Sequence, residues 1–335
     1  MSRLFPNFSG ETMLRAWLPA APARGKLLSA ARWVVTLLAF WVVVRSIDLG
    51  AVIAAMGGAA PLGLGLIGLV VAAQFALLVW RWQLVIRLLC GQTVGFGALA
   101  LVLGHSFLIG QALPSSIGGD VARVALLSRS TGAVAATRSV ICDRLLGFAG
   151  LAVIVLPTIP VILAMIGGRA GHLMLTIGAL GTVAAVALIL GCSLSFRGQW
   201  LARHLATIAG DLLVALRSGR LGLMAIALAI GGSLFCVLLL YVIGRAIGAD
   251  LQAWDCLVLA PSALLVSALP ISLGGWGVRE GALIGAFSLV HADPAGVAAV
   301  SVIFGLTTPL VGALTAATGL LAGWRDLPEG SGNAG

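Results

Sequence analysis

The feature that most constrains this chain is a series of long apolar stretches that contain no charged residue. Pro61–Val79, Leu145–Ile166 and Leu221–Ile243 are three of them, and each is about long enough for a helix to cross the roughly 30 Å hydrocarbon core of a bilayer. Helices are expected because the stretches lack the two-residue alternation of barrel strands. A helix also satisfies its own backbone hydrogen bonds in lipid. The chain is therefore predicted to be an all-α, polytopic membrane protein.

The composition excludes several classes of protein. Hydrophobic residues make up 60% of the chain and charged residues 9%, whereas soluble domains contain about 25% charged residues. An ordinary soluble enzyme, a disordered chain and a disulfide-stapled secreted domain are thereby excluded. The net charge of +9 comes from arginines placed between apolar stretches, without a basic stripe interleaved with aromatics, so nucleic acid is not an expected partner. The isolated cysteines are interpreted as small core side chains.

The apolar stretches also predict the organisation of the chain. We expect six membrane-spanning helices, at residues 33–44, 61–79, 145–166, 173–192, 221–243 and 295–323. A cytoplasmic leader, a membrane domain and a cytoplasmic tail are expected at residues 1–26, 27–324 and 325–335.

An internal repeat is the most informative pattern. Leu101–Leu127 and Leu257–Leu283 align without a gap at an offset of 156, with thirteen of 27 positions identical. Both copies read Ala-Leu-Pro-x-Ser-apolar-Gly-Gly, followed by three residues and an arginine. Transporters are commonly built from such repeats, and the pattern favours a duplication.

Each copy is predicted to form a hairpin. An apolar helix of about 15 residues reaches about 22 Å, which is short of the roughly 30 Å that a span requires. The Pro-Ser-Gly-Gly break that follows predicts a helix that enters the membrane and returns on the same side. Non-helical backbone at that depth is tolerated only when it is buried in protein or lines a wet cavity.

The distribution of arginine predicts the orientation of the hairpins. With the N-terminus in the cytoplasm and both copies re-entrant, sixteen Lys and Arg residues fall inside and four fall outside. The four outside residues are Arg45, Arg169, Arg245 and Arg279. The positive-inside rule favours this arrangement. It makes the first hairpin enter from the cytoplasm and the second from the opposite side, which is an inverted repeat.

Arg123 and Arg279 occupy equivalent positions and are the main candidates for function. An arginine inside a membrane costs about 2.5–3.5 kcal/mol on insertion scales and usually has a partner or a function. Its planar guanidinium suits phosphate, and neighbouring glycines allow a ligand to approach closely. The predicted head-group site consists of Arg123, Arg279, Gly118, Gly119, Gly274, Gly275, Ser116 and Ser272. The alternative is that Arg123 and Arg279 form structural ion pairs with Asp120 and Glu280.

Four further charged residues are candidate charge partners or proton-relay groups. They are Asp120, Asp143, Arg144 and Glu280. Asp120 can alternatively cap a helix, and Asp143 with Arg144 can form an interfacial anchor. The sequence lacks metal-ligand spacing, a nucleophile elbow and a phosphate loop. No metal, no cofactor and no enzymatic activity are therefore expected, and His105 is interpreted as a buried imidazole.

Three motifs in order resemble a known family. They are Pro114-Ser-Ser-Ile-Gly-Gly-Asp-x-x-Arg123, Asp143-Arg-x-x-Gly147 and Leu269-Pro-Ile-Ser-Leu-Gly-Gly-Trp-Gly-Val-Arg-Glu280. Over roughly residues 30–324 the chain resembles the lysylphosphatidylglycerol synthase transmembrane-region family, also called flippase-like domain proteins. In bifunctional members this membrane domain is implicated in flipping aminoacylated phospholipid, and a separate soluble domain transfers the amino acid. We expect no such soluble domain here, because the chain ends at Gly335.

The resemblance, together with the arginines, leads to a functional expectation. The protein is predicted to be a flippase or transporter of the bacterial inner membrane, with an anionic, glycosylated or hopanoid lipid as its substrate. Relatives without the soluble domain imply lipid- or glycan-biosynthesis enzymes as partners, and the oligomeric state is left open. Two alternatives stay open. A small-solute secondary transporter would have a sealed polar cavity, and a lipid-modifying transferase would gather Asp120, Asp143 and His105 around one cavity.

Overall fold

The computed structural model describes residues 61–112, 118–166, 207, 210–214, 217–267 and 276–321, and its regular elements in these ranges are all helices. Among the described residues, four helices contain a stretch long and apolar enough to cross a membrane. They are α4 (Pro61–Cys90), α7 (Ala133–Ile166), α10 (Arg220–Ala246) and α13 (Pro294–Leu321). They correspond to four predicted spans. The spans predicted at 33–44 and 173–192 lie outside the described residues, as do the predicted leader and tail.

Two of the long helices extend well beyond the predicted spans. Helix α4 continues past Val79 to Cys90, and α7 begins at Ala133 rather than at Leu145. The predicted spans stop short of Arg81 and Asp143, whereas both helices continue through these residues. Arg81 and Asp143 form an ion pair inside the bundle, so each charge is neutralised by the other helix and neither helix has to end there.

Four shorter helices form two packed pairs. Helix α5 (Phe96–Ala112) packs on α6 (Gly118–Thr131), and α11 (Ala253–Ser267) packs on α12 (Val278–Phe287). The close approach in the first pair requires glycine, because a Cβ atom on Gly119 would lie 3.1 Å from the carbonyl oxygen of Ser106. A short 3-10 helix, η1 (Ser288–Val290), follows α12.

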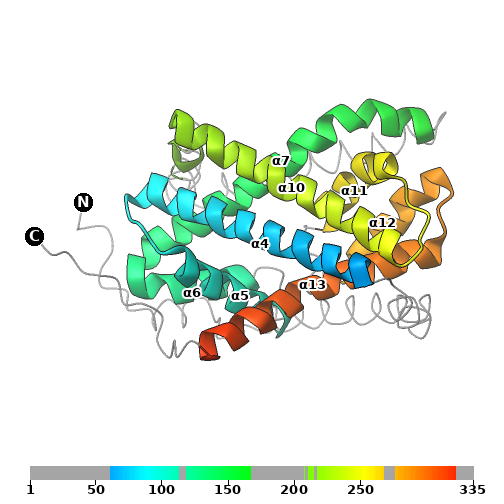
Figure 1. Ribbon diagram of the computed structural model, residues 1–335. Coiled ribbons are helices and arrows are strands. Elements are labelled where there is room, and N and C mark those ends of the chain that lie inside the picture. The colour runs from blue at the N-terminus through cyan, green and yellow to red at the C-terminus, as the bar shows by residue number, and fades with distance from the viewer. Residues whose placement is uncertain are drawn as a thin grey trace, which may run out of the picture.

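The two pairs of short helices lie at opposite ends of the bundle. Figure 1 shows α5 and α6 at the end where α4 stops and α7 and α10 begin. Helices α11 and α12 lie at the other end, where α10 stops and α13 begins. The contacts cross over, since α5 packs against α13 and α11 packs against α7. Each pair of short helices is therefore braced by the long helix that follows the other pair.

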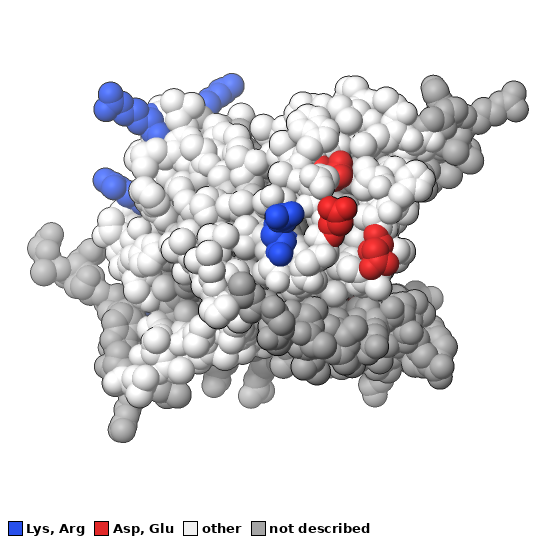
Figure 2. Space-filling view, turned by 45° about the vertical axis from the view of Figure 1, so that its right-hand side comes forward, with Lys and Arg blue, Asp and Glu red and all other residues white. Residues whose placement is uncertain are grey.

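The described charges at the two ends have opposite signs. Exposed arginines at the end that holds α5 and α6 are Arg87, Arg129, Arg217 and Arg220. At the other end are Arg245 and three acidic residues, Asp250, Asp255 and Asp293. Figure 2 shows the acidic side chains gathered together with a basic side chain beside them, and further basic side chains at the far end.

Apolar packing forms two large cores, and a smaller third core joins α4, α7 and α10. The larger core joins α10, α11, α12 and α13 around Ile243, Leu259 and Leu283. The other core joins α4, α5, α6 and α7 around Trp82 and Leu99. The outer faces are also apolar, as expected of a surface that meets lipid. Large exposed hydrophobic residues include Leu62, Leu69, Leu156, Leu223, Leu310 and Leu314.

Candidate functional site

A cavity of about 460 Å³ lies within the helical bundle. Its charged lining consists of four arginines and two aspartates, namely Arg81, Arg123, Arg144, Arg279, Asp120 and Asp143. Much of the remaining lining is apolar and includes Leu78, Leu103, Phe107, Phe148, Leu151, Leu264 and Phe304. The cavity therefore combines an excess of positive charge with apolar walls.

The centre of the first charge cluster is Asp143 on α7. Its Oδ1 accepts a hydrogen bond from Nε of Arg81 on α4 over 2.8 Å, and its Oδ2 accepts one from Nη2 of Arg123 on α6 over 2.9 Å. The exposed fractions of the three side chains are 8% for Arg81, 9% for Arg123 and 5% for Asp143. One buried carboxylate thus joins three helices and holds two buried guanidinium groups.

The guanidinium of Arg123 is fixed by further contacts. Its Cζ lies 4.0 Å from the centre of the Trp82 ring, and its Nη1 lies 3.8 Å from Oδ1 of Asp120. Trp82 is in turn held by a hydrogen bond of 3.3 Å from its Nε1 to Oγ of Ser139. Within the part of the chain that the structure describes, Nε of Arg123 is the one buried side-chain nitrogen or oxygen with no hydrogen-bond partner. An oriented donor is therefore left unused beside the cavity.

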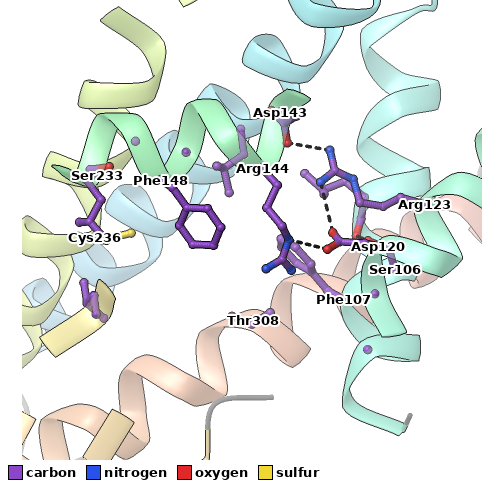
Figure 3. A pocket seen from close by; sticks show the side chains of 18 of the residues that line it. Ser106, Phe107, Asp120, Arg123, Asp143, Arg144, Phe148, Ser233, Cys236 and Thr308 are labelled. Carbon is purple, nitrogen blue, oxygen red and sulfur yellow. Dashed lines mark hydrogen bonds and ion pairs between the residues drawn. The ribbon is translucent and has the colours of Figure 1, made fainter. Parts of the chain in front are cut away.

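A second ion pair lies at a more open part of the cavity. Nε of Arg144 lies 2.5 Å from Oδ2 of Asp120, and the exposed fractions of the two side chains are 39% and 15%. Figure 3 shows Arg144 reaching from α7 toward Asp120 on α6, with Phe107 and Phe148 pointing into the same space. This pair connects α6 to α7 in addition to the buried contact through Asp143.

Arg81 is a site residue that the sequence analysis missed. It was assigned to a cytoplasmic segment, but it lies buried within α4 and lines the cavity. Its terminal nitrogens lie against α7 at Gly147, where a Cβ atom would lie 3.4 Å from both Nη1 and Nη2, in ordinary van der Waals contact. The available signal was the position of Arg81 just after a fully apolar stretch, between Trp80 and Trp82.

The second cluster, around Arg279 on α12, is neutral. Nη2 of Arg279 donates to Oε1 of Glu280 over 2.6 Å, and its Nε donates to Oγ of Ser301 on α13 over 3.2 Å. Glu280 has no exposed surface. Its Oε1 also accepts a hydrogen bond of 3.1 Å from Ser301, and its Oε2 accepts one of 2.5 Å from the backbone N–H of Gly277. Arg279 and Glu280 therefore balance each other's charge inside the protein.

The structure brings the two predicted arginines to one cavity, although they come from different copies of the repeat. The ion pair predicted between Arg279 and Glu280 is present. Arg123 approaches Asp120, as the alternative expected, but its shorter contact is to Asp143.

The remaining predicted site residues divide into two groups. Gly119 lines the cavity, and Gly118 is buried at the start of α6. Four predicted residues lie outside the described residues, namely Ser116, Ser272, Gly274 and Gly275.

The transferase alternative depends on where His105, Asp120 and Asp143 lie and on what they bind. Nδ1 of His105 lies 2.7 Å from the carbonyl oxygen of Leu101, so the ring is paired with the backbone of its own helix. Asp120 and Asp143 line the cavity, but each is bound to arginine. Among the described residues, no group of three or more His, Cys, Asp and Glu is placed to hold a metal ion.

The family comparison covers most of the chain. The model of the family described as "Lysylphosphatidylglycerol synthase TM region" matches residues 29–316. This range contains both copies of the repeat and all six charged residues of the cavity. No curated protein matches the chain.

Proposed function

The chain belongs to the lysylphosphatidylglycerol synthase TM region family, and from this premise we propose that it is a lipid flippase or lipid transporter. Its substrate is an anionic lipid, including glycosylated or hopanoid lipids that carry an anionic head group. The protein acts without catalysing a chemical reaction, and the enzymes that supply or consume the lipid are its expected partners.

The observation that carries this proposal is the charge of the cavity. Four arginines and two aspartates line it, and Glu280 balances Arg279, so one positive charge remains in excess. Guanidinium groups are suited to phosphate and carboxylate because they present planar pairs of donors. An anionic head group would balance the excess positive charge. Apolar neighbours such as Phe107 and Phe148 exclude water and thereby strengthen the interaction between the arginines and an anion.

The proposed route of the head group passes between two inverted hairpins. The pairs α5–α6 and α11–α12 lie at opposite ends of the bundle, and each packs on the long helix that follows the other. This crossed packing is what two repeats related by a two-fold axis in the membrane plane would produce. Rocking of one repeat against the other would expose Arg123 and Arg279 to each side in turn, while the acyl chains stay in lipid.

The proposed location is the bacterial inner membrane, with both termini in the cytoplasm. Support comes from the exposed arginines, four of which lie at the end of the bundle that holds α5 and α6, whereas Arg245 lies with three acidic residues at the other end. The positive-inside rule places the arginine-rich end in the cytoplasm.

A vesicle assay tests the proposed function. The full chain is reconstituted into vesicles that contain fluorescent phosphatidylglycerol or fluorescent phosphatidylcholine, and an impermeant quencher reports the label that reaches the outer leaflet. We expect faster movement of the anionic lipid. Arg123→Lys and Arg279→Lys should slow this movement, because lysine keeps the charge but loses the planar pair of donors.

The matched control is Arg129→Lys, because Arg129 is exposed on the same helix as Arg123. It should transport like the unmodified protein. Unchanged transport by monodisperse Arg123→Lys and Arg279→Lys proteins would contradict the proposed function.

A further inference from the structure

We propose that Arg81 and Arg123, held on the two oxygens of Asp143, form a binding site for one phosphate group that carries a single negative charge. The inference rests on the proposed function and deepens it. It adds Arg81 to the residues that contact the ligand, and it specifies the charge and chemical class of the group that binds.

The first argument is an unbalanced buried charge. Arg81, Arg123 and Asp143 are each at least nine-tenths buried, and together they carry a formal charge of +1. The nearby pair of Asp120 and Arg144 is neutral, so it leaves this sum unchanged. Burying an uncompensated charge is strongly unfavourable. A ligand with one negative charge would neutralise the cluster.

The second cluster differs from the first in this respect. Arg279 is neutralised by the fully buried Glu280 and also bonded to Ser301. Residues of both clusters line the same cavity. The excess positive charge belongs to the cluster of Arg81, Arg123 and Asp143. An anion is therefore expected to bind most tightly between α4, α6 and α7.

The guanidinium N–H groups that Asp143 does not use also support the site. Arg81 uses its Nε for Asp143, and its Nη1 and Nη2 lie beside Gly147, which lines the cavity together with Arg81. Nε of Arg123 is buried without a partner. The stack of Arg123 on Trp82 and the two hydrogen bonds to Asp143 fix both guanidinium planes before a ligand arrives, which reduces the entropy lost on binding.

A phosphodiester fits these requirements. It has one negative charge at neutral pH and several oxygens that can accept hydrogen bonds from two guanidinium groups. A phosphomonoester carries about two negative charges and would leave the cluster with an excess of the opposite sign. The phosphodiester can belong to a lipid head group or to a soluble molecule, and the experiment below separates these sources.

The experiment measures binding by the purified full chain in neutral detergent with isothermal titration calorimetry. The probes are dihexanoyl phosphatidylglycerol, glycerophosphoglycerol, inorganic phosphate and dihexanoyl phosphatidylcholine. We expect the phosphatidylglycerol probe to bind best. Arg81→Gln and Arg123→Gln should each weaken its affinity by about tenfold or more, because each change removes charge-assisted hydrogen bonds.

Matched controls come from the same helices. Arg87 on α4 and Arg129 on α6 are exposed arginines, each six positions after its cavity counterpart, and Arg87→Gln and Arg129→Gln should bind as the unmodified protein does. Arg81→Gln leaves the neutral pair of Arg123 and Asp143, so its melting temperature without ligand should stay close to normal. If it unfolds nevertheless, Arg81→Lys retains the charge and should still lose affinity through the lost donor pair.

The outcomes separate the inference from the proposed function. Absence of binding by any anionic probe to the unmodified protein would overturn both. A second outcome would overturn the inference alone. In it, Arg123→Gln loses the binding of phosphatidylglycerol, but a folded Arg81→Gln or Arg81→Lys protein binds it as the unmodified protein does. Equal affinity for glycerophosphoglycerol and the lipid, with both lost in Arg81→Gln, would support the phosphate site and contradict a lipid as its specific ligand.

Discussion

The guanidinium of Arg123 is stacked on the indole ring of Trp82, with 4.0 Å between Cζ and the ring centre. Trp82 is fully buried, and its Nε1 donates a hydrogen bond to Ser139 on α7. A cation–π contact of this kind contributes about 0.5–2 kcal/mol, more when it is shielded from water. Trp82 on α4 therefore contacts Arg123 on α6 and Ser139 on α7, and so links the three helices.

Replacing Trp82 should therefore affect both stability and transport. Trp82→Phe retains an aromatic face and should reduce transport modestly, whereas Trp82→Leu removes the stack and should reduce it strongly. The measurements are the melting temperature in detergent and lipid movement in vesicles. Trp80→Leu is the control, because Trp80 is 47% exposed on the same helix. Equal effects of Trp80→Leu and Trp82→Leu would contradict a specific role for the stack.

Asp143→Asn should be among the most destabilising single changes in the chain. It leaves Arg81 and Arg123 buried together without their carboxylate, and breaking a buried ion pair in this way costs about 3–5 kcal/mol. Asp211→Asn is the comparison: its carboxylate is also buried, with 7% of the side chain exposed, but its partner Arg138 is 40% exposed and stays in contact with solvent when the carboxylate is removed. Its loss of stability should therefore be the smaller one. Denaturant titration of both proteins measures the difference. Similar losses in the free energy of unfolding would show that Asp143 is not the centre of the cluster.

Gly305→Ala should displace Arg279. A Cβ atom at residue 305 would lie 2.7 Å from Cζ of Arg279, and this guanidinium cannot move away without losing Glu280 or Ser301. Transport of anionic lipid should fall, and the melting temperature should drop.

The control for this change is Gly285→Ala on α12. A Cβ atom there meets nothing within 4 Å, and alanine favours a helix over glycine by about 1 kcal/mol. Gly285→Ala should be neutral or slightly stabilising in the same two measurements. A normal melting temperature and normal transport in Gly305→Ala would contradict the assigned packing of Arg279.

The two ends of the bundle should face opposite sides of the membrane. In a background without native cysteines, Ala295→Cys at the start of α13 should react with an impermeant maleimide on intact cells. Arg129→Cys on α6 should react only after the membrane is permeabilised. Both positions are exposed. Labelling of both from the same side would contradict the inverted arrangement of the hairpins.

The helical spans could be predicted because membrane insertion depends mainly on local hydrophobic length. The stretch 221–243 was predicted as a span, and α10 covers Arg220–Ala246. The ends of α4 and α7 could not be predicted in the same way. Whether a helix continues through a charged residue depends on a partner from another helix, and Arg81 and Asp143 are 62 residues apart.

The sequence predicted some residues of the candidate site but not Arg81. The repeat identified Arg123 and Arg279 because they occupy equivalent positions in both copies. Arg81 has no such counterpart, since the residue 156 positions later is Val237. A repeated pattern can point only to residues that its two copies share, so an arginine present in one half alone was overlooked.

The sequence by itself determined the helical class, the family resemblance and the pair of arginines, because these follow from local hydrophobicity and from short motifs. Only the tertiary structure decided which carboxylate binds Arg123. Asp120 is close to Arg123 in the chain, yet the distant Asp143 makes the shorter contact, at 2.9 Å against 3.8 Å. Ion pairing depends on the distance between side chains in space. The charge of each buried cluster is therefore set by how α4, α6, α7 and α12 pack, and this packing leaves one cluster positive and the other neutral.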